Sequence, residues 1–314
     1  MSINRPPGYL RVSLLSACNL QCSYCLPAGK RRPTIFAPDD RVRSAIRLLH
    51  HFGIRKIRFT GGEPTLSKSL CELVSFVKAL DGDIHTAITS NGVLLASKAQ
   101  ALSAAGLDSA NISLDTLDPA KFRALTGRDY LDRVISGIYA AAKHIGSVKL
   151  NCVLMQGIND DETEKLILFA DSRGLDLRFI EFMPNRYSAL GDPRFVSSDE
   201  ILDRLPWDLR PLPGRPNGAA RYYTAPSLAI KVGFISPVSH PFCDGCDRVR
   251  LTAGGLLYTC LYDSSSINLF DLLTADYGRA RTAFDELMRS KQFGGCRSTT
   301  GSATTLPSFF AMGG

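Results

Sequence analysis

From Leu10 to Met183, short apolar runs alternate with segments whose apolar positions recur at helical spacing. A helix is predicted to begin after Pro38, with Asp39 as its N-cap, and to end at Gly53. Strands, rich in β-branched residues, are expected at residues 10–15, 56–60, 84–89, 108–114, 148–154 and 177–182. This alternation predicts parallel strands joined by crossover helices.

Six such units are too few to close an eight-stranded barrel, so the expected α/β fold is a partial, open (β/α)6 barrel. The pattern changes after the sixth strand, with a proline- and glycine-rich stretch at residues 211–218 and strand-like runs at 221–224 and 228–235. These features predict two domains. The barrel would cover residues 1–185, and a C-terminal α+β domain would cover residues 186–314.

Polar motifs directly follow four of the expected strands. They are Gly61-Gly62-Glu63-Pro64, Thr89-Ser90-Asn91-Gly92, Ser113-Leu114-Asp115 and Glu181-Phe182-Met183. In a parallel barrel the C-terminal ends of the strands share one mouth, where ligands bind. We therefore expect these motifs to surround one site, although a Gly-Gly pair on its own usually indicates only a turn.

Three cysteines follow the first expected strand in the spacing C-x3-C-x2-C: Cys18, Cys22 and Cys25. Such a loop can wrap three thiolates around one 4Fe-4S cluster and leave the fourth iron without a protein ligand. A ferredoxin that only transfers electrons closes its cluster with a fourth cysteine, and a structural zinc site also takes four ligands. The spacing therefore predicts chemistry at an open iron.

A second triplet lies in the C-terminal half, where Cys243, Cys246 and Cys260 form a C-x2-C-x13-C arrangement. A zinc ribbon needs a second C-x2-C pair, and Cys296 is the only free cysteine downstream. A second 4Fe-4S cluster with an open iron fits this spacing better than zinc does.

The composition supports metal chemistry in a reducing compartment. Six of the nine cysteines fall into the two triplets, whereas Cys71, Cys152 and Cys296 stand alone in contexts typical of buried structural thiols. No apolar run reaches membrane-spanning length and the N-terminus shows no signal-peptide core, so a cytoplasmic protein is expected. The net charge of +7 comes from scattered basic residues, which favours a small polyanionic substrate over nucleic acid.

The first triplet, with Tyr24 just before its last cysteine, resembles the signature of the radical S-adenosylmethionine (SAM) enzymes. In that family, SAM binds the open iron through its methionine moiety and is cleaved to a 5'-deoxyadenosyl radical. Both triplets, the Arg-x-Arg after Cys246 and the terminal Gly-Gly together resemble the molybdenum cofactor biosynthesis protein A family, the GTP 3',8-cyclases. The similar segments are residues 9–13, 59–64, 113–118, 125–128, 178–183 and 242 onward.

The resemblance implies a role for each matching residue. SAM contacts are expected from Tyr24, Gly62, Glu63, Ser113 and Met183, and the ligands of two 4Fe-4S clusters are Cys18, Cys22, Cys25, Cys243, Cys246 and Cys260. Substrate contacts are expected from Arg11, Lys56, Arg58, Thr89, Lys149, Arg178, Arg248 and Arg250. The catalytic set combines Cys18, Cys22 and Cys25 with Arg248, Arg250, Gly313 and Gly314, the last two as a tail in the active-site mouth. Independently of the resemblance, guanidinium and ammonium groups suit a triphosphate.

The resemblance also implies a reaction and its partners. GTP would become (8S)-3',8-cyclo-7,8-dihydroguanosine 5'-triphosphate, in the first step of molybdenum cofactor biosynthesis, by hydrogen abstraction at ribose C3' and attack on guanine C8. An external one-electron donor such as flavodoxin or ferredoxin would supply the electron. A cyclic pyranopterin monophosphate synthase would take the product onward. A homodimer is compatible with this picture, and neither a membrane nor a nucleic acid is expected as a partner.

Two other interpretations stay open. Ser16-Ala17 stands where the family usually has an acidic-basic pair, and Ser67-Lys68 where it usually has an arginine. These differences fit a paralogous radical SAM enzyme that acts on another nucleotide or on a peptide. The other interpretation is an iron-sulfur electron carrier without catalysis, which the two open irons argue against.

Overall fold

The computed structural model describes residues 7–25, 34–183, 194–214, 218–262, 265–274 and 276–291. The barrel wall consists of parallel strands: β1 (Tyr9–Ser13), β2 (Lys56–Thr60), β3 (His85–Ser90), β4 (Ser109–Ser113), β5 (Ser147–Leu154) and β6 (Asp176–Glu181). The predicted partial (β/α)6 barrel is confirmed. Each strand lies within two residues of its expected bounds.

Further strands extend this sheet at both edges. Beyond β1 follow, from the inside outward, β10 (Arg248–Leu251), β11 (Leu256–Tyr258) and β12 (Ser266–Asn268). Beyond β6 follow β9 (Val232–Ile235), β8 (Ala220–Thr224) and β7 (Arg210–Pro211). The strand order is β12-β11-β10-β1-β2-β3-β4-β5-β6-β9-β8-β7, and both β10 and β9 are parallel to their barrel neighbours. Strands on both sides of the expected domain boundary near residue 185 thus belong to one continuous sheet, and the boundary itself stays a prediction.

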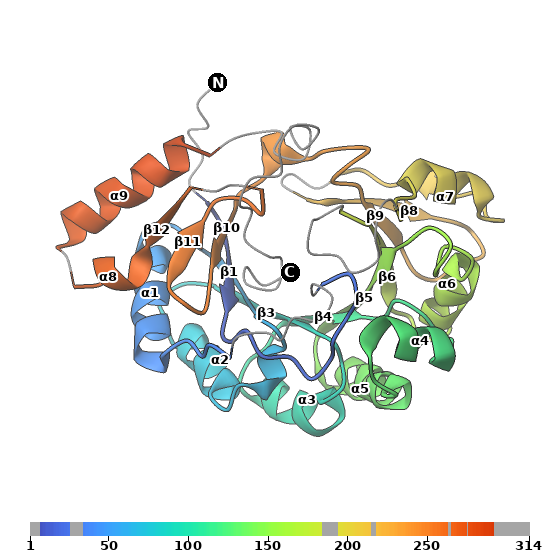
Figure 1. Cartoon of the computed structure of the whole chain (residues 1–314), viewed down its shortest axis with the longest axis horizontal. Helices are drawn as coiled ribbons and strands as arrows, with labels where there is room; N and C mark the ends of the chain where they lie inside the picture. Colours follow the sequence, from blue (N-terminus) through green and yellow to red (C-terminus); the bar gives the residue numbers. More distant parts are fainter. Residues whose placement is uncertain are drawn as a thin grey trace.

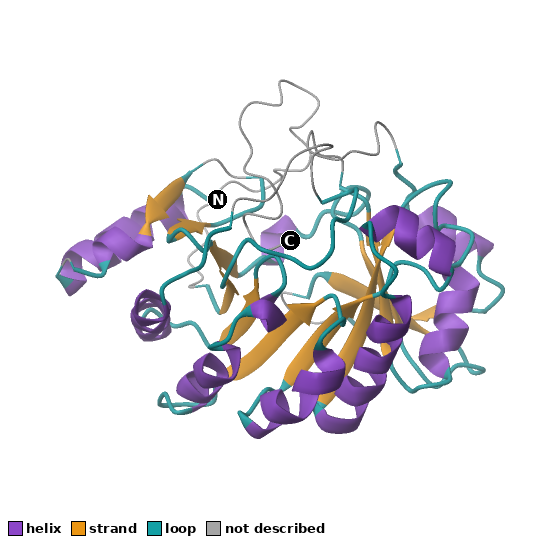
Figure 2. Cartoon of the chain, turned by 60° about the horizontal axis from the view of Figure 1, so that its bottom comes forward, coloured by secondary structure: helices purple, strands orange, loops and turns teal. Residues whose placement is uncertain are grey.

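The helices that connect the barrel strands cover the outer side of the sheet (Figure 1). They are α1 (Asp39–His51), α2 (Leu70–Lys78), α3 (Leu95–Ala104), α4 (Pro119–Thr126), α5 (Leu131–His144) and α6 (Thr163–Asp171). The other helices are α7 (Ser198–Arg204), α8 (Leu269–Leu272), α9 (Tyr277–Arg289) and the short 3-10 helices η1 (Pro64–Leu66) and η2 (Cys243–Gly245). Figure 2 shows the barrel strands side by side, with helices along their outer side. No helix in the described segments is long and apolar enough to cross a bilayer.

Alternation along the strands separates an apolar face from a polar one. On β5, Leu150 and Cys152 are fully buried in the core between sheet and helices, while Lys149 and Asn151, one position away, are only partly buried. Successive side chains of a strand point to opposite faces, so the second pair lies on the inner side of the barrel. Each barrel strand therefore has inward-facing positions whose side chains are not part of the apolar core and can line a site.

Two local expectations were wrong. Pro38, not Asp39, is the N-cap of α1; it has extended backbone angles, and Asp39 instead accepts a hydrogen bond from the Ser69 hydroxyl at 2.7 Å. The run at residues 228–235 becomes a strand only from Val232 onward. The Asp171 carboxylate accepts the backbone N–H of Ala229 at 2.7 Å, which keeps that part of the run out of the sheet.

Candidate active site

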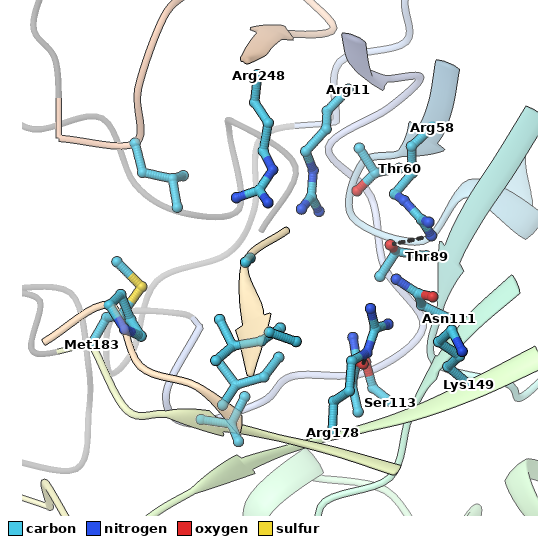
Figure 3. A pocket seen from close by; sticks show the side chains of 18 of the residues that line it. Arg11, Arg58, Thr60, Thr89, Asn111, Ser113, Lys149, Arg178, Met183 and Arg248 are labelled. Carbon is cyan, nitrogen blue, oxygen red and sulfur yellow. Dashed lines mark hydrogen bonds between the residues drawn. The ribbon is translucent and has the colours of Figure 1, made fainter. Parts of the chain in front are cut away.

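A cavity of about 800 Å³ occupies the inner side of the barrel. Its walls come from β1 to β6, from β10, and from the loops that carry the cysteines of both triplets. Figure 3 shows Arg11 and Arg248 reaching in from one side and Arg178 from the opposite side, so that their guanidinium groups point toward a common space. A volume of this size can hold a nucleotide-sized ligand.

The strand register gathers the cations of this cavity into a layer. Arg11 on β1 is paired in register with Arg58 on β2 and with Arg250 on β10. Side chains at the same register on neighbouring parallel strands point to the same face, which brings the three guanidinium groups together. The cations that line the cavity are Arg11, Lys56, Arg58, Lys149, Arg178, Arg248 and Arg250.

Several of these cations, buried or partly buried, have no carboxylate partner in the part of the chain that the structure describes. Burial lowers the pKa of Arg178, and burial together with the neighbouring Arg248 charge lowers the pKa of Arg250 to about 10. The Nη2 atom of Arg178 and the Nη1 atom of Arg250 have no hydrogen-bond partner among the described residues. Within the same residues, Lys149 pairs with Asp176 at 2.5 Å, whereas Arg58, Arg178 and Arg250 form no ion pair with a carboxylate. Such a set favours an anionic ligand, because unpaired buried charge costs several kcal/mol.

The Gly61-Gly62-Glu63 turn ties the end of β2 to the first cysteine loop. The Gly62 N–H donates to the Leu15 carbonyl at 2.6 Å, and the Glu63 N–H donates to the Ala17 carbonyl at 2.9 Å. The Glu63 carboxylate is buried and accepts from the Ser90 hydroxyl at 2.8 Å and the Asn91 N–H at 2.7 Å. Burial raises the pKa of this carboxyl group, and these hydrogen bonds counteract the rise. Glu63 thus joins the loops after β2 and β3.

The turn comes very close to the first cysteine loop at Gly62, since a Cβ atom there would lie 2.0 Å from the Ala17 carbonyl oxygen. We expect Gly62→Ala to destabilise the protein by at least about 3 kcal/mol, the upper end of ordinary overpacking, and to reduce iron uptake at the first triplet. Thermal unfolding and iron per chain measure the two effects. Gly214→Ala is the matched control, because no atom lies within 4 Å of its added Cβ. Equal stability and iron content in the two variants would contradict the close approach.

The first cysteine triplet, Cys18, Cys22 and Cys25, forms part of the cavity wall with partly buried thiols. Backbone N–H groups of its loop donate to carbonyls at the end of α4, from Gln21 to Thr126 and from Ser23 to Leu125, both at 2.9 Å. The Leu20 N–H donates to the Cys18 sulfur at 3.4 Å. Donation to sulfur favours a thiolate, which is the form that binds iron.

The second triplet, Cys243, Cys246 and Cys260, faces the same cavity from the other side of β1. Burial raises the pKa of Cys260, and the nearby Cys246 and Cys243 thiols raise it further, which places the three sulfurs in one neighbourhood. The buried Lys291 ammonium holds this loop by donating to the carbonyls of Cys246, at 2.7 Å, and Arg248, at 3.2 Å.

Both triplets fit a cluster better than a single ion. In the part of the chain that the structure describes, no three His, Cys, Asp or Glu side chains are arranged to hold one metal ion. Each triplet nevertheless presents three thiols to the cavity. A zinc ion needs four ligands at short distances, whereas a four-iron cluster accepts three thiolates at separate corners.

The second half of the first loop is fixed by a buried pair. The Tyr24 hydroxyl donates to Asp115 Oδ2 at 2.7 Å, and Asp115 Oδ1 accepts the Val153 N–H at 2.8 Å. Burial raises the pKa of the Asp115 carboxyl group to about 6. This pair connects the loop to the ends of β4 and β5.

All predicted site residues within the described part of the chain line this one cavity: Arg11, Cys18, Cys22, Tyr24, Cys25, Lys56, Arg58, Gly62, Glu63, Thr89, Ser113, Lys149, Arg178, Met183, Cys243, Cys246, Arg248, Arg250 and Cys260. Their individual roles stay predictions. Gly313 and Gly314 lie outside the described residues. Sequence reasoning did not single out Tyr9, Asn111 or Asn151, which also line the cavity. Each stands two positions from a predicted contact, so strand alternation was the signal that could have found them.

Two family models match the chain. Residues 12–170 match the radical SAM superfamily, and residues 175–295 match Molybdenum Cofactor Synthesis C. A GTP 3',8-cyclase from Alkaliphilus oremlandii (strain OhILAs) is 39% identical over 277 residues, which cover 85% of each chain. A GTP 3',8-cyclase from Campylobacter jejuni (strain RM1221) is 36% identical over 319 residues, 99% of this chain and 98% of its own.

Solved structures support the fold. Streptococcus suis SuiB bound to S-adenosylmethionine superimposes with a TM-score of 0.65 at 17% identity, over 88% of this chain and 68% of its own. At that identity the likeness concerns the fold alone.

Proposed function

Because the chain belongs to the GTP 3',8-cyclase family of the radical SAM superfamily, we propose that its cavity converts GTP to (8S)-3',8-cyclo-7,8-dihydroguanosine 5'-triphosphate in molybdenum cofactor biosynthesis. One observation carries this proposal: Arg58, Arg178 and Arg250, which have no carboxylate partner among the described residues, face the same cavity as both cysteine triplets. A triphosphate supplies the charge that these cations lack.

The residues present fit the two clusters and SAM. Cys18, Cys22 and Cys25 would hold one 4Fe-4S cluster, and Cys243, Cys246 and Cys260 the other. When bound at the first triplet, a reduced cluster with SAM supplies reductive cleavage to a 5'-deoxyadenosyl radical. Tyr24, Gly62, Glu63, Ser113 and Met183 are the proposed SAM contacts.

The chain's own contribution is placement and charge. Guanidinium groups bind phosphate oxygens in bidentate fashion and fix the triphosphate on one side of the cavity, and Lys149 and Thr89 extend this surface along β5 and β3. Holding the nucleotide there determines which ribose hydrogen faces the site of radical formation, and this is how orientation accelerates a reaction. The buried walls also keep water away from a reactive radical.

The proposal extends to partners and location. An external one-electron donor of the flavodoxin or ferredoxin type supplies the electron, a cyclic pyranopterin monophosphate synthase consumes the product, and a homodimer is compatible with the fold. Six cysteines that must act as thiolates suit the cytoplasm, which keeps thiols reduced. Gly313 and Gly314 are proposed to reach the substrate.

The test uses anaerobically reconstituted protein, dithionite and SAM, incubated with GTP, ATP, CTP or no nucleotide. Mass spectrometry scores 5'-deoxyadenosine and cyclised nucleotide separately. We expect both products with GTP and little of either without it. 5'-Deoxyadenosine at full rate with another nucleotide would point to a paralogous substrate, and its complete absence in protein with two loaded clusters would favour the electron carrier.

A further inference from the structure

Tyr9, at the start of β1, lies among the cations of the cavity. It is in register with Lys56 on β2 and with Arg248 on β10. The Lys56 ammonium nitrogen lies 5.0 Å from the centroid of the Tyr9 ring, and the Arg248 guanidinium carbon lies 5.9 Å from it. The Tyr9 oxygen accepts a hydrogen bond from Arg58 Nε at 2.5 Å.

Building on the proposed function, we propose that Tyr9 is a positioning residue for the triphosphate. In the nucleotide-free protein its phenolate oxygen is the anionic partner of Arg58. When a polyphosphate engages the same cations, that oxygen takes up one proton and becomes a neutral hydrogen-bonding group.

The electrostatic surroundings of Tyr9 support a phenolate. Burial alone would raise the pKa of the phenol, but the surrounding cations, Arg58 first and then Arg11, Lys56 and Arg248, lower it to about 7. The charged groups around it come from its own strand and from β2, β6 and β10, and all but one are basic. They are Arg11 on β1, Lys56 and Arg58 on β2, Arg178 on β6, Arg248 and Arg250 on β10, and the acidic residue Asp247 just before β10, whose backbone carbonyl accepts the Tyr9 N–H.

A bound polyphosphate removes the cause of this acidity. Its negative charges neutralise the cations that stabilise the phenolate, so the pKa of Tyr9 rises in the complex. Below about pH 7 the phenol already carries its proton, and binding takes up none from solution. Above that pH the phenol must be protonated on binding, so the affinity for the polyphosphate falls by up to about tenfold per pH unit.

The hydrogen bond also orients Arg58. The Nη1 atom of this guanidinium donates to the Ile88 carbonyl and contacts the Thr89 hydroxyl at 3.4 Å, which leaves Nε to Tyr9. Tyr9 thus completes the set of hydrogen-bond partners that fix the orientation of the Arg58 guanidinium group. Without the phenol oxygen, the guanidinium keeps its contacts to β3 but loses its partner on β1.

The experiment measures GTP binding to the cluster-loaded protein by calorimetry, without SAM or reductant, at about pH 8 and about pH 6. Two buffers of different ionisation enthalpy report how many protons are taken up. For the wild type we expect about 0.9 proton more than for Tyr9→Phe at about pH 8, and only about 0.1 proton more at about pH 6. Inorganic tripolyphosphate, which has no nucleoside, should give the same difference.

Tyr222→Phe is the matched control, since Tyr222 also lines the cavity but hydrogen-bonds to Arg178, and its ring lies 5.8 Å from the Lys149 ammonium nitrogen. It should keep the wild-type proton uptake. Equal uptake in the wild type and Tyr9→Phe would overturn the inference about Tyr9. If the wild type bound neither GTP nor tripolyphosphate, the proposed function would fail instead.

A second measurement needs no variant. Ultraviolet difference spectra of the wild type should show tyrosinate absorbance growing between about pH 6 and pH 8 and disappearing when GTP is added. Tyrosinate absorbance that stays unchanged when GTP is added would contradict the proton uptake. This result does not depend on whether Tyr9→Phe folds.

Discussion

Cys22→Ser is expected to lose SAM cleavage completely while the protein still folds. The Cys22 thiol is partly buried in the cavity wall and belongs to a loop that backbone hydrogen bonds already hold in place. A serine hydroxyl does not ionise near neutral pH and is a poor iron ligand, so the first cluster is lost. The measurement is 5'-deoxyadenosine formed per chain after anaerobic reconstitution and reduction.

Two comparisons make this result specific. Cys71→Ser removes a partly buried thiol of α2 that does not line the cavity, so it should cleave SAM at the wild-type rate. Cys243→Ser should still produce 5'-deoxyadenosine but no cyclised nucleotide, because it affects only the second triplet. Wild-type 5'-deoxyadenosine from Cys22→Ser would remove the first triplet from the chemistry.

Arg178→Met is expected to weaken GTP binding about tenfold to a hundredfold without destabilising the nucleotide-free protein. A lost charge-assisted contact costs about 1.5 to 3 kcal/mol of binding. In the absence of nucleotide, however, Arg178 hydrogen-bonds to Asn151, at 2.9 Å, and to Tyr222 but pairs with no carboxylate within the described residues, and its Nη2 atom is unsatisfied there. Replacing a buried unpaired charge by an apolar side chain of similar length is neutral or stabilising.

Lys149→Met provides the contrast within the same cavity. Lys149 is paired with Asp176 at 2.5 Å, and its loss leaves a half-buried carboxylate without its cation. This variant should therefore lose both GTP affinity and stability, whereas Arg178→Met loses affinity alone. Calorimetric binding constants and urea unfolding without nucleotide separate the two. A loss of stability in Arg178→Met as large as in Lys149→Met would show that the Arg178 charge is compensated in the fold.

The barrel strands could be predicted because each has a local sequence pattern that is typical of a strand. The run from Lys56 to Thr60 has the same bounds in prediction and structure, since β-branched and apolar residues end there at a glycine pair. The prediction that the polar motifs meet at the C-terminal ends of the strands followed from the parallel arrangement alone. The cysteine spacings identified six cavity residues without any knowledge of the sheet.

Long-range pairing could not be predicted in the same way. Nothing local indicates that Arg250 stands beside Arg11, although this neighbourhood produces the cation layer. Tyr9 was not singled out, because an aromatic residue at the start of a strand is usually part of the core. The run from Leu228 to Lys231 looked like strand because its alternation is right, and only the Asp171 contact excludes it from the sheet.

The residues of the cavity also bear on the two other interpretations, an electron carrier and an enzyme that acts on a peptide. An electron carrier has no use for cavity cations such as Arg178 and Arg250, which have no carboxylate partner among the described residues. A peptide is a poor match for them unless it is strongly acidic. The polar layer thus argues for a small polyanion on physical grounds that are separate from family membership.

The pairing of β1 with β10 has a consequence for how the protein is made. β1 leaves the ribosome long before residues 248–251, which cover one of its edges. Until then this edge is open, and its Leu10 and Val12, fully buried in the finished fold, belong to an unfinished core. The nascent barrel therefore spends most of its synthesis in an aggregation-prone form, and a fragment that ends before β10 keeps that form permanently.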